Sequence, residues 1–387
     1  MWYNAASAFA HPRPETDLCR NCRAVAYGRT ATIGPYQHKI VERTVQAVAD
    51  RHQNILIESA TGSGKTLMAL MAIQALHEKY GWTAGWTAMR KHLIHQAAEE
   101  NKNTLNLPYV QFFSTFNDHP PEGIDILVED EGHHSASATS VELYKTLKPK
   151  LHLGLTATPF RTDRMKLCFS TVIKDAGIRA LIDQGFLAPY HQYVYHGEWD
   201  PATVAMVYLS DRERWGKSVG FFLTEDECQR CADLIREGGV RCEVVTGSSN
   251  QEEQIEAFNH GDVQVLLNMV VLTEGFDSPI LKTVFIRPGS KGPTIQMGGR
   301  VFRKHADKPT AQIVQSNRSK WPFVRIASSE RKFICDAGGA WEERANNERV
   351  RQAQRATITA IAATNVSMPQ YLKKYQKKQN MLFQSND

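Results

Sequence analysis

Short apolar runs rich in β-branched residues recur along the chain and alternate with stretches of helical periodicity. The first run covers residues 54–58 (NILIE), and a helical pattern follows over residues 64–80. The other apolar runs cover residues 125–129, 151–155, 218–222, 241–245, 263–268 and 283–287. This alternation predicts an α/β fold in which helices cover a parallel sheet.

The α/β pattern occurs in two series, which predicts two domains in this chain of 387 residues. Between the series, in the stretch DQGFLAPYHQYVYHGEWDP, Gly, Pro and aromatic residues interrupt any helical periodicity, and we place the domain boundary near residue 195. The predicted parts are an irregular N-terminal arm over residues 1–32, a first α/β domain over residues 33–195, a second over residues 196–335 and a helical, basic extension over residues 336–387.

A glycine-rich segment, SATGSGKT, follows the first predicted strand over residues 59–66. Between a strand and a helix, such a loop points backbone N–H groups at phosphate oxygens, and the helix N-terminus favours negative charge. The pattern assigns Lys65 to the β- and γ-phosphates and Thr66 to Mg²⁺, although the strict G-x-x-x-x-G-K-[ST] pattern has Gly where this chain has Ser59. The loop residues expected at the nucleotide are Thr61, Gly62, Ser63 and Gly64.

Acidic residues and histidines end the next apolar run, in the stretch DILVEDEGHH. Because the apolar part predicts a buried strand, we expect Asp130 and Glu131 at the carboxyl edge of the sheet, beside the phosphate loop. Asp130 is predicted to hold Mg²⁺ through water and Glu131 to act as the general base of a nucleoside triphosphatase. Zinc is the alternative, but the adjacent His133 and His134 cannot easily share one metal, and the H-E-x-x-H spacing is absent.

The seven cysteines show no regular framework spacing, which favours reduced thiols. Cys228 and Cys231 fall, with two apolar neighbours, at i, i+3, i+4 and i+7 of one predicted helix, which is the spacing of a core face. Cys19 and Cys22 lie in the irregular arm, where a metal knuckle stays open although no second close pair follows at zinc-site spacing.

Composition is ordinary for a globular protein, with 42% hydrophobic and 22% charged residues. No stretch approaches the roughly 20 apolar residues of a membrane-spanning helix, and the N-terminus lacks the features of a secretory signal. Of the net charge of +5, the last 47 residues carry +4, from eight Lys/Arg against four Asp/Glu. Such a basic tail suits a polyanionic partner, and a solvated helical face is the alternative.

With these motifs the chain resembles the superfamily 2 helicases, most closely the group that includes bacterial RadD and eukaryotic XPB. The resemblance covers roughly residues 33–316. ATGSGKT is the phosphate loop of that family, and DEGH stands where the family has DEAH or DECH, with Gly132 as the departure. The resemblance implies two tandem RecA-like domains with ATP and Mg²⁺ in the cleft between them.

The resemblance also implies roles in nucleotide binding and hydrolysis. Gln37, in GPYQ, takes the place of the adenine reader. In QMGGRVFRKH, Gln296 would orient the attacking water or the γ-phosphate, and Arg300 and Arg303 would neutralise the charge that develops during hydrolysis. Two residues of VVLTEGFDSP are expected near the nucleotide, Gly275 and Asp277.

Other matching segments imply coupling and strand contacts. By resemblance His133 couples the nucleotide to the TAT segment, represented by Thr156 and Thr158. Backbone amides and small hydroxyls at loop ends suit phosphate contacts, which position a strand without reading its sequence. The candidate nucleic-acid contacts are Arg90, Lys91, Thr115, Thr246, Gly247 and Thr273.

The sequence therefore predicts an ATP-dependent helicase or translocase that acts on DNA rather than RNA, in replication, recombination or repair. A duplex translocase that does not separate strands and an ATP-gated nucleic-acid clamp are the alternatives. We expect a monomer without a membrane partner, in the cytoplasm of a bacterial or phage-infected cell and associated with the nucleoid.

Overall fold

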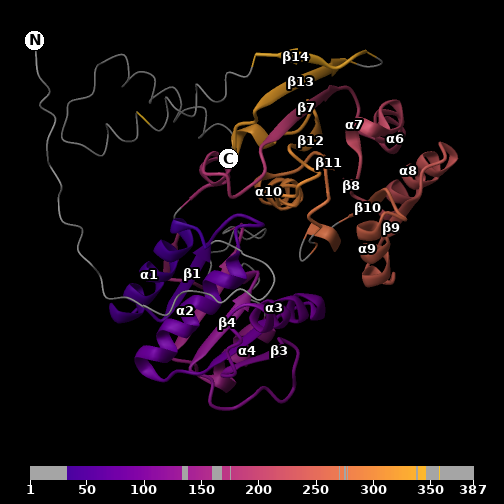
Figure 1. Ribbon diagram of the computed structural model, residues 1–387. Helices are drawn as coiled ribbons and strands as arrows, with labels where there is room; N and C mark the ends of the chain where they lie inside the picture. Colours follow the sequence, from indigo (N-terminus) through magenta and orange to yellow (C-terminus); the bar gives the residue numbers. More distant parts are fainter. Residues whose placement is uncertain are drawn as a thin grey trace, which may run out of the picture.

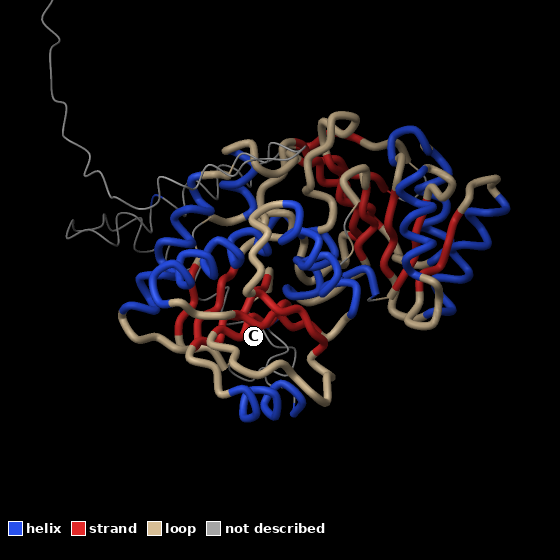
Figure 2. Tube along the Cα trace, turned by 60° about the horizontal axis from the view of Figure 1, so that its bottom comes forward, coloured by secondary structure: helices blue, strands red, loops and turns tan. Residues whose placement is uncertain are grey.

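The computed structural model describes residues 33–132, 138–158, 168–174, 176–269, 271–273, 276, 278–336, 339–345 and 357 (Figure 1). It contains two sheets, and Figure 2 shows two groups of strands with helices around each. The predicted α/β class with two tandem units of RecA-like architecture is confirmed. The N-terminal arm, with Cys19 and Cys22, lies outside the described residues.

The first sheet is wholly parallel, with the strand order β3-β2-β4-β5-β1-β6. In chain order its strands are β1 (Asn54–Glu58), β2 (Ala84–Ala88), β3 (Val110–Ser114), β4 (Ile126–Asp130), β5 (Leu151–Thr156) and β6 (Thr171–Ile173). The helices of this domain are α1 (Pro35–Ala49), α2 (Lys65–Tyr80), α3 (Lys91–Asn103), α4 (Ala138–Leu147) and α5 (Ile178–Asp183). Strands β1, β4 and β5 lie where the apolar runs predicted them, because each is buried on both faces.

The second sheet has the order β14-β13-β7-β12-β11-β8-β10-β9, and only β14 is antiparallel to its neighbour. Its strands are β7 (Tyr190–His196), β8 (Ser218–Phe221), β9 (Cys242–Val245), β10 (Val265–Asn268), β11 (Thr283–Ile286), β12 (Ala311–Ser316), β13 (Arg331–Asp336) and β14 (Glu342–Arg344). The helical elements are α6 (Pro201–Ser210), α7 (Arg212–Trp215), α8 (Glu225–Glu237), α9 (Gln251–His260), η2 (Val271–Thr273), α10 (Lys291–Gly299) and η3 (Phe323–Arg325).

Strand pairing corrects both ends of the predicted second domain. β7 pairs with β12 and β13, so the second domain begins at or before Tyr190 and not near residue 195. At the other end, the expected extension from residue 336 onward opens with β14 and not with a helix. The Trp341 ring explains this start, because it packs edge-on against Tyr193 and Trp215 at centroid distances of 5.1 and 5.6 Å. The lysine-rich tail beyond it lies outside the described residues.

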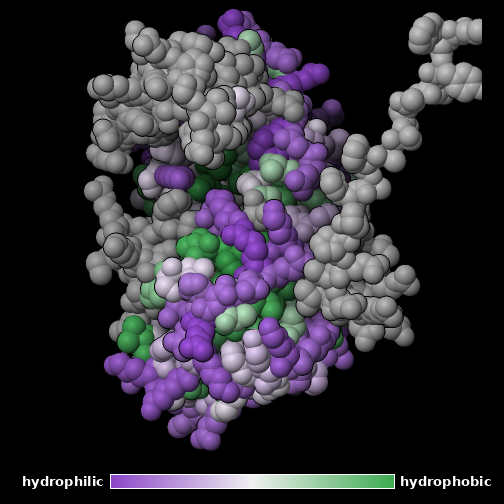
Figure 3. All heavy atoms as spheres, turned by 90° about the vertical axis from the view of Figure 1, so that its left-hand side faces the viewer, coloured by the Kyte–Doolittle hydropathy of each residue, from purple (hydrophilic) through white to green (hydrophobic). Residues whose placement is uncertain are grey.

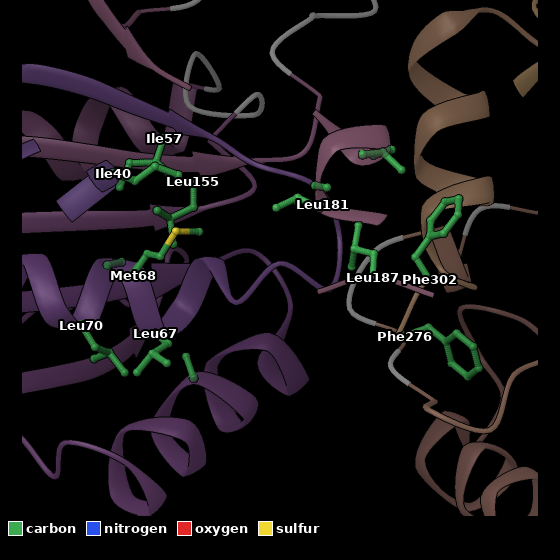
Figure 4. Close-up of a cluster of buried hydrophobic side chains, with 14 of the residues drawn as sticks. Ile40, Ile57, Leu67, Met68, Leu70, Leu155, Leu181, Leu187, Phe276 and Phe302 are labelled. Atoms are coloured by element: carbon green, nitrogen blue, oxygen red, sulfur yellow. The ribbon is translucent and has the colours of Figure 1, made fainter. Parts of the chain in front are cut away.

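One apolar cluster runs through both domains. In Figure 4 it extends from Ile57 and Met68 beside the first sheet, past Leu187, to Phe302 in the second domain. The Ala188 backbone N–H donates to the Phe302 carbonyl oxygen at 2.8 Å, so the connecting segment is bonded to the second domain. We call residues 187–188 and Phe302 the interdomain seam.

The predicted core role of Cys228 and Cys231 is confirmed, because both are fully buried on α8. Burial raises the pKa of the Cys228 thiol to about 12. On the face that Figure 3 turns to the viewer, the described residues are mostly hydrophilic, with small separate hydrophobic patches. Among the described helices, none has the length and apolar character that crossing a membrane requires.

Candidate ATP site and nucleic-acid interface

The phosphate loop curls tightly between β1 and α2. Gly62 and Gly64 have φ angles of 78° and 80°, in the left-handed region that glycine adopts without strain. The Ser63 backbone N–H donates to the Ala60 carbonyl oxygen at 3.2 Å, and the hydroxyls of Ser59 and Ser63 lie 2.7 Å apart. Ser59, which departs from the strict pattern, therefore helps to fix the curl of the loop.

Lys65 begins α2 and folds back over this loop. Its Nζ lies 3.4 Å from the Ser59 carbonyl oxygen and 3.5 Å from that of Ala60. Burial lowers the pKa of Lys65, while the charges of Glu131 and Asp130 oppose that shift. The lysine therefore brings a partly buried positive charge to the point where the loop N–H groups would meet phosphate.

The acidic pair stands at the end of β4, as expected. Burial first, and then the neighbouring charge of Glu131, raises the pKa of Asp130 to about 6, although Lys65 and Arg300 act against the shift. Glu131 has a left-handed φ of 53°, and its backbone N–H donates to Asp130 Oδ1 at 3.0 Å. Burial of the Asp130 carboxylate thus outweighs the charges of Lys65 and Arg300, and a divalent cation bound there would favour the ionised carboxylate.

Gly132, the departure from the family box, is packed tightly. A Cβ built on it would lie 3.1 Å from Gly154 Cα and 3.3 Å from the Phe169 ring. These distances are shorter than ordinary van der Waals contact, so the neighbouring strand β5 would have to shift to accommodate a side chain at position 132. Glycine at this position lets the acidic end of β4 lie close against β5.

Gln37 sits beneath the phosphate loop at the start of α1. Its Nε2 donates to the Ser63 carbonyl oxygen at 3.1 Å, and its Oε1 accepts from the Gly34 backbone N–H at 2.8 Å. The Tyr36 hydroxyl donates to the same Ser63 oxygen at 2.6 Å. The glutamine expected to read adenine therefore also supports the loop that would bind the phosphates.

The end of α10 in the second domain abuts the phosphate loop of the first. A Cβ built on Gly299 would lie 3.0 Å from Thr61 Oγ1, and one built on Gly62 would lie 3.9 Å from the Arg303 backbone nitrogen. The buried Arg300 donates from Nη1 to the Phe276 carbonyl oxygen at 3.0 Å, and its charge lowers the pKa of Lys65. The structure thus brings Arg300, and the backbone of Arg303, to the site of Lys65 and Asp130.

The TAT segment bridges the same cleft. Gln296 Nε2 lies 3.4 Å from Thr158 Oγ1, which links α10 to the loop after β5. Thr156 Oγ1 accepts from the Thr158 backbone N–H at 3.0 Å, and the Ser59 backbone N–H donates to the Thr156 carbonyl oxygen at 3.0 Å. The segment therefore contacts both the phosphate loop and the second domain. His133, its expected partner, lies outside the described residues.

The candidate strand contacts of the first domain differ in exposure. Lys91 is exposed, whereas Arg90 reaches across the cleft and donates to the Val271 carbonyl oxygen at 3.1 Å. Thr115 is 3% exposed, and its hydroxyl lies 2.9 Å from that of Thr87. The Thr115 side chain therefore faces the interior and braces β2 against β3.

In the second domain, Thr246 and Gly247 form the loop after β9. The Thr246 hydroxyl accepts from the backbone N–H groups of Ser248 and Ser249 at 3.3 and 3.2 Å, which fixes the turn, and Gly247 is exposed. Thr273 ends η2, and its side chain, Gly275 and Asp277 lie outside the described part of the chain.

A cleft of about 530 Å³ lies between the domains on this side of the molecule. It is lined by Lys91, His92 and Gln96 of α3, by Ser249 to Glu252, Ile255, Glu256 and Asn259 at α9, and by Val271, Leu272 and Phe276. The candidate contact Lys91 therefore borders a space that both domains form, and Arg90 is bonded to Val271, which lines that space.

A buried polar cluster beside the acidic pair has no counterpart in the expectations from sequence. Glu129 is 4% exposed, accepts from Ser140 Oγ at 2.8 Å, and lies 3.0 Å from His152 Nε2. It ties α4, β4 and β5 together one residue before Asp130. The signal in the sequence was a carboxylate inside an otherwise apolar run, since such residues are seldom buried without partners.

Two family models match this chain. The model described as Type III restriction enzyme, res subunit, matches residues 30–116 and 109–161, and that described as Helicase conserved C-terminal domain matches residues 202–305. A 51.5 kDa protein of a Lactococcus phage (isolate 7-9) is 22% identical over 339 residues, which cover 79% of this chain and 75% of that protein. The putative ATP-dependent helicase IRC3 of Saccharomyces cerevisiae is 21% identical over 347 residues, covering 72% of this chain and 50% of its own length.

Solved structures show the same architecture. The ATP-dependent Type ISP restriction-modification enzyme LlaBIII bound to DNA superposes with a TM-score of 0.58 at 16% identity, over 87% of this chain and 31% of that one. S. cerevisiae Dbp5 bound to RNA and ADP BeF3 superposes with a TM-score of 0.54 at 15% identity, over 79% of this chain and 94% of that one. At such identities the likeness concerns the fold. With the two family models falling in order on the two domains, the chain belongs to the superfamily 2 helicases.

Proposed function

We propose that this helicase is a DNA-dependent ATPase motor whose site forms only when both domains close on the nucleotide. The observation that carries the proposal is the contact of the phosphate loop with the end of α10, where Thr61 meets Gly299 and Arg300 lies within electrostatic reach of Lys65. One domain brings the phosphate cradle and acids, and the other brings the arginines.

The residues of the first domain have distinct roles in this proposal. The N–H groups of the loop and Lys65 bind the β- and γ-phosphates. Thr66 and Asp130 would hold Mg²⁺, which, when bound, neutralises phosphate charge, and the carboxylate of Asp130 at the end of β4 suits that role. Glu131 takes the proton of the attacking water. Gln37, beneath the loop, reads adenine.

The second domain completes hydrolysis and links it to movement. Arg300 and Arg303 stabilise the charge that develops on the γ-phosphate, and Gln296 orients the attacking group. Because Gln296 also contacts Thr158, a change at the γ-phosphate alters a contact between the domains. His133, Gly275 and Asp277 keep their proposed roles in coupling and nucleotide binding.

DNA is the proposed track. The matched restriction-subunit model and the DNA-bound restriction enzyme favour DNA, whereas the RNA-bound Dbp5 shows that the fold also serves RNA. Exposed Lys91 and the Thr246–Ser249 turn supply phosphate contacts on the two sides of the cleft. The phage relative supports a phage or bacterial setting. A monomer that acts in the cytoplasm is part of this proposal.

The test is ATPase activity measured in parallel with single-stranded DNA, blunt duplex, forked DNA and RNA. We expect DNA to stimulate hydrolysis more than RNA and forked DNA to release a displaced strand. Stimulation by duplex without strand release would favour a duplex translocase, which the restriction-enzyme relatives make the second candidate. Absence of stimulation by every nucleic acid would refute the motor.

A further inference from the structure

Phe116 is a solvent-exposed aromatic residue at the carboxyl end of β3. It lies two residues beyond β3 and is 55% exposed, whereas the preceding Thr115 is 3% exposed. The two residues form a turn after β3, in which the Thr115 side chain lies inside and the Phe116 side chain lies in solvent. A single exposed apolar side chain is common on a protein surface, so the interest of Phe116 lies in its position at the carboxyl edge of the sheet.

The backbone holds this ring in a fixed place. The Phe116 backbone N–H donates to Ser114 Oγ at 3.2 Å, and the Asn117 N–H donates to the Ser114 carbonyl oxygen at 3.0 Å. The Thr115 N–H donates to the Ala88 carbonyl oxygen at 3.2 Å, which joins the turn to β2. Phe116 is therefore presented by a bonded turn, and a rigid aromatic loses little entropy on binding.

The surroundings suit a nucleic-acid strand. Because β2 and β3 are parallel neighbours in register, the segment after β2 runs beside Phe116 and brings Met89, which is 39% exposed, followed by Arg90 and Lys91. Lys91 lines the cleft between the domains. The same edge of the sheet thus offers cations for phosphates and a flat apolar ring beside them.

We propose that Phe116 stacks on a base of the bound strand and makes this motor prefer a single strand with unstacked bases over intact duplex. This inference rests on the proposed function. In a duplex both faces of each base are covered by neighbours, while the phosphates stay accessible. Phosphate contacts therefore serve both forms, and an aromatic ring adds affinity only where a base face is free.

Tyr80 offers a matched control. It is another exposed aromatic of the first domain, at 40%, but it ends α2 at the opposite, amino edge of the sheet. There it stacks on Trp82 at a centroid distance of 4.9 Å. Tyr80→Ala removes an exposed aromatic ring, as Phe116→Ala does, but it should leave the binding of a nucleic-acid strand unchanged.

The experiment compares Phe116→Ala, Phe116→Leu, Phe116→Trp and Tyr80→Ala by fluorescence anisotropy, with oligo-dT and with blunt duplex at one salt concentration. Phe116→Ala should bind oligo-dT roughly 10-fold more weakly, the scale of a lost base–aromatic stack, and duplex as wild type does. Phe116→Trp should keep the affinity and Phe116→Leu should lose part of it. Quenching of 2-aminopurine in a single strand should disappear in Phe116→Ala alone.

Equal weakening on single strand and duplex, or none on either, would overturn the stacking role. A wild-type protein that no nucleic acid binds or stimulates would instead refute the proposed function. If wild type is stimulated by DNA and Phe116→Ala responds identically to single strand and duplex, only the present inference fails.

Discussion

The carboxyl edges of the two sheets differ in the kind of side chain that they carry. In the first domain the edge concentrates charge, with Lys65, Asp130 and Glu131 in one partly or fully buried group. In the second domain the corresponding edge after β9 is a turn of small hydroxyl residues around Thr246, and its buried cation, Arg300, comes from the end of α10. Arg300 of the second domain adds to the charge of Lys65 in favouring the ionised form of Asp130, so closure of the two domains and the charge at the nucleotide site are linked.

The largest expected effect is from Lys65→Ala, which removes the cation of the first domain. ATPase activity should fall to background, because the charge aimed at the β- and γ-phosphates is lost, while circular dichroism shows a folded protein. Lys79→Ala, at the exposed far end of the same helix, is the control. Substantial hydrolysis by Lys65→Ala at saturating ATP would disprove the assignment of the phosphate loop.

Arg303→Ala tests the contribution of the second domain. Hydrolysis should slow by about 10³–10⁵, the range for arginine fingers in related triphosphatases, and nucleic acid should no longer stimulate it. ATP binding, measured by calorimetry, should stay near normal. Arg241→Ala, which changes an exposed arginine of the same domain paired with Asp262 at 3.8 Å, should leave turnover unchanged. Retained strand-stimulated turnover in Arg303→Ala would contradict a site shared between the domains.

Glu129→Ala tests the polar cluster under the acidic edge. Ser140 and His152 would each lose a buried acceptor, at about 1–3 kcal/mol apiece, so the first domain should lose roughly 3 kcal/mol of unfolding free energy in urea. Glu142→Ala removes an exposed carboxylate that pairs with Lys145 at 3.4 Å and should cost less than about 0.5 kcal/mol. Similar losses in both variants would show that the cluster contributes nothing special.

Asp130→Asn should stabilise the protein while abolishing hydrolysis. The pKa of Asp130 rises from 3.8 to about 6 on folding, so its charge opposes folding above pH 6 and has no effect below about pH 4. Without Mg²⁺ and nucleotide, Asn should therefore add on the order of 1–3 kcal/mol at pH 7.5, a gain that vanishes near pH 4.

Asp125→Asn is the control of opposite sign. Burial acts to raise the pKa of Asp125, but hydrogen bonds from Lys150 and Thr83 outweigh it and lower that pKa below 3.8. Its charge favours folding at neutral pH, so Asn should destabilise there. Stabilisation by both substitutions, or by neither, would contradict the opposite pKa shifts of Asp130 and Asp125.

The smallest effect concerns the basic tail, which belongs to neither sheet. If Lys373, Lys374, Lys377 and Lys378 contact phosphates, each contact adds about 0.9 to the slope of log affinity against log salt on duplex DNA. Deleting residues 370–387 should flatten that slope. An unchanged slope would indicate that the tail is a solvated surface.

The buried strands and the phosphate loop could be predicted because their signals are local. The centre of Asn54–Glu58 is wholly apolar and buried, and the glycine-rich sequence after it is typical of a phosphate loop. β7 was missed as the first strand of the second sheet because its aromatic, polar and apolar residues are interleaved, and only pairing with β12 and β13 identifies it. The family is confirmed, whereas its subgroup around RadD and XPB stays a prediction.

Side-chain direction explains why some candidate nucleic-acid contacts have other partners in the structure. The sequence indicated a nucleic-acid contact at Thr115, but in the structure that hydroxyl is buried against Thr87, while Phe116 is exposed. Arg90 likewise reaches a backbone carbonyl of the other domain. A motif locates the segment, but the partner that a side chain meets depends on residues distant in the chain.

The interdomain seam has a mechanical consequence. Leu187 and Phe302 belong to one continuous apolar cluster, and the backbone bond at Ala188 joins them at a point next to the phosphate loop. Packed apolar contacts resist stretching but permit small rotations, so a rotation of one domain against the other would pivot at the seam. The cleft between α3 and α9 is lined by residues of both domains, and such a rotation would change its width.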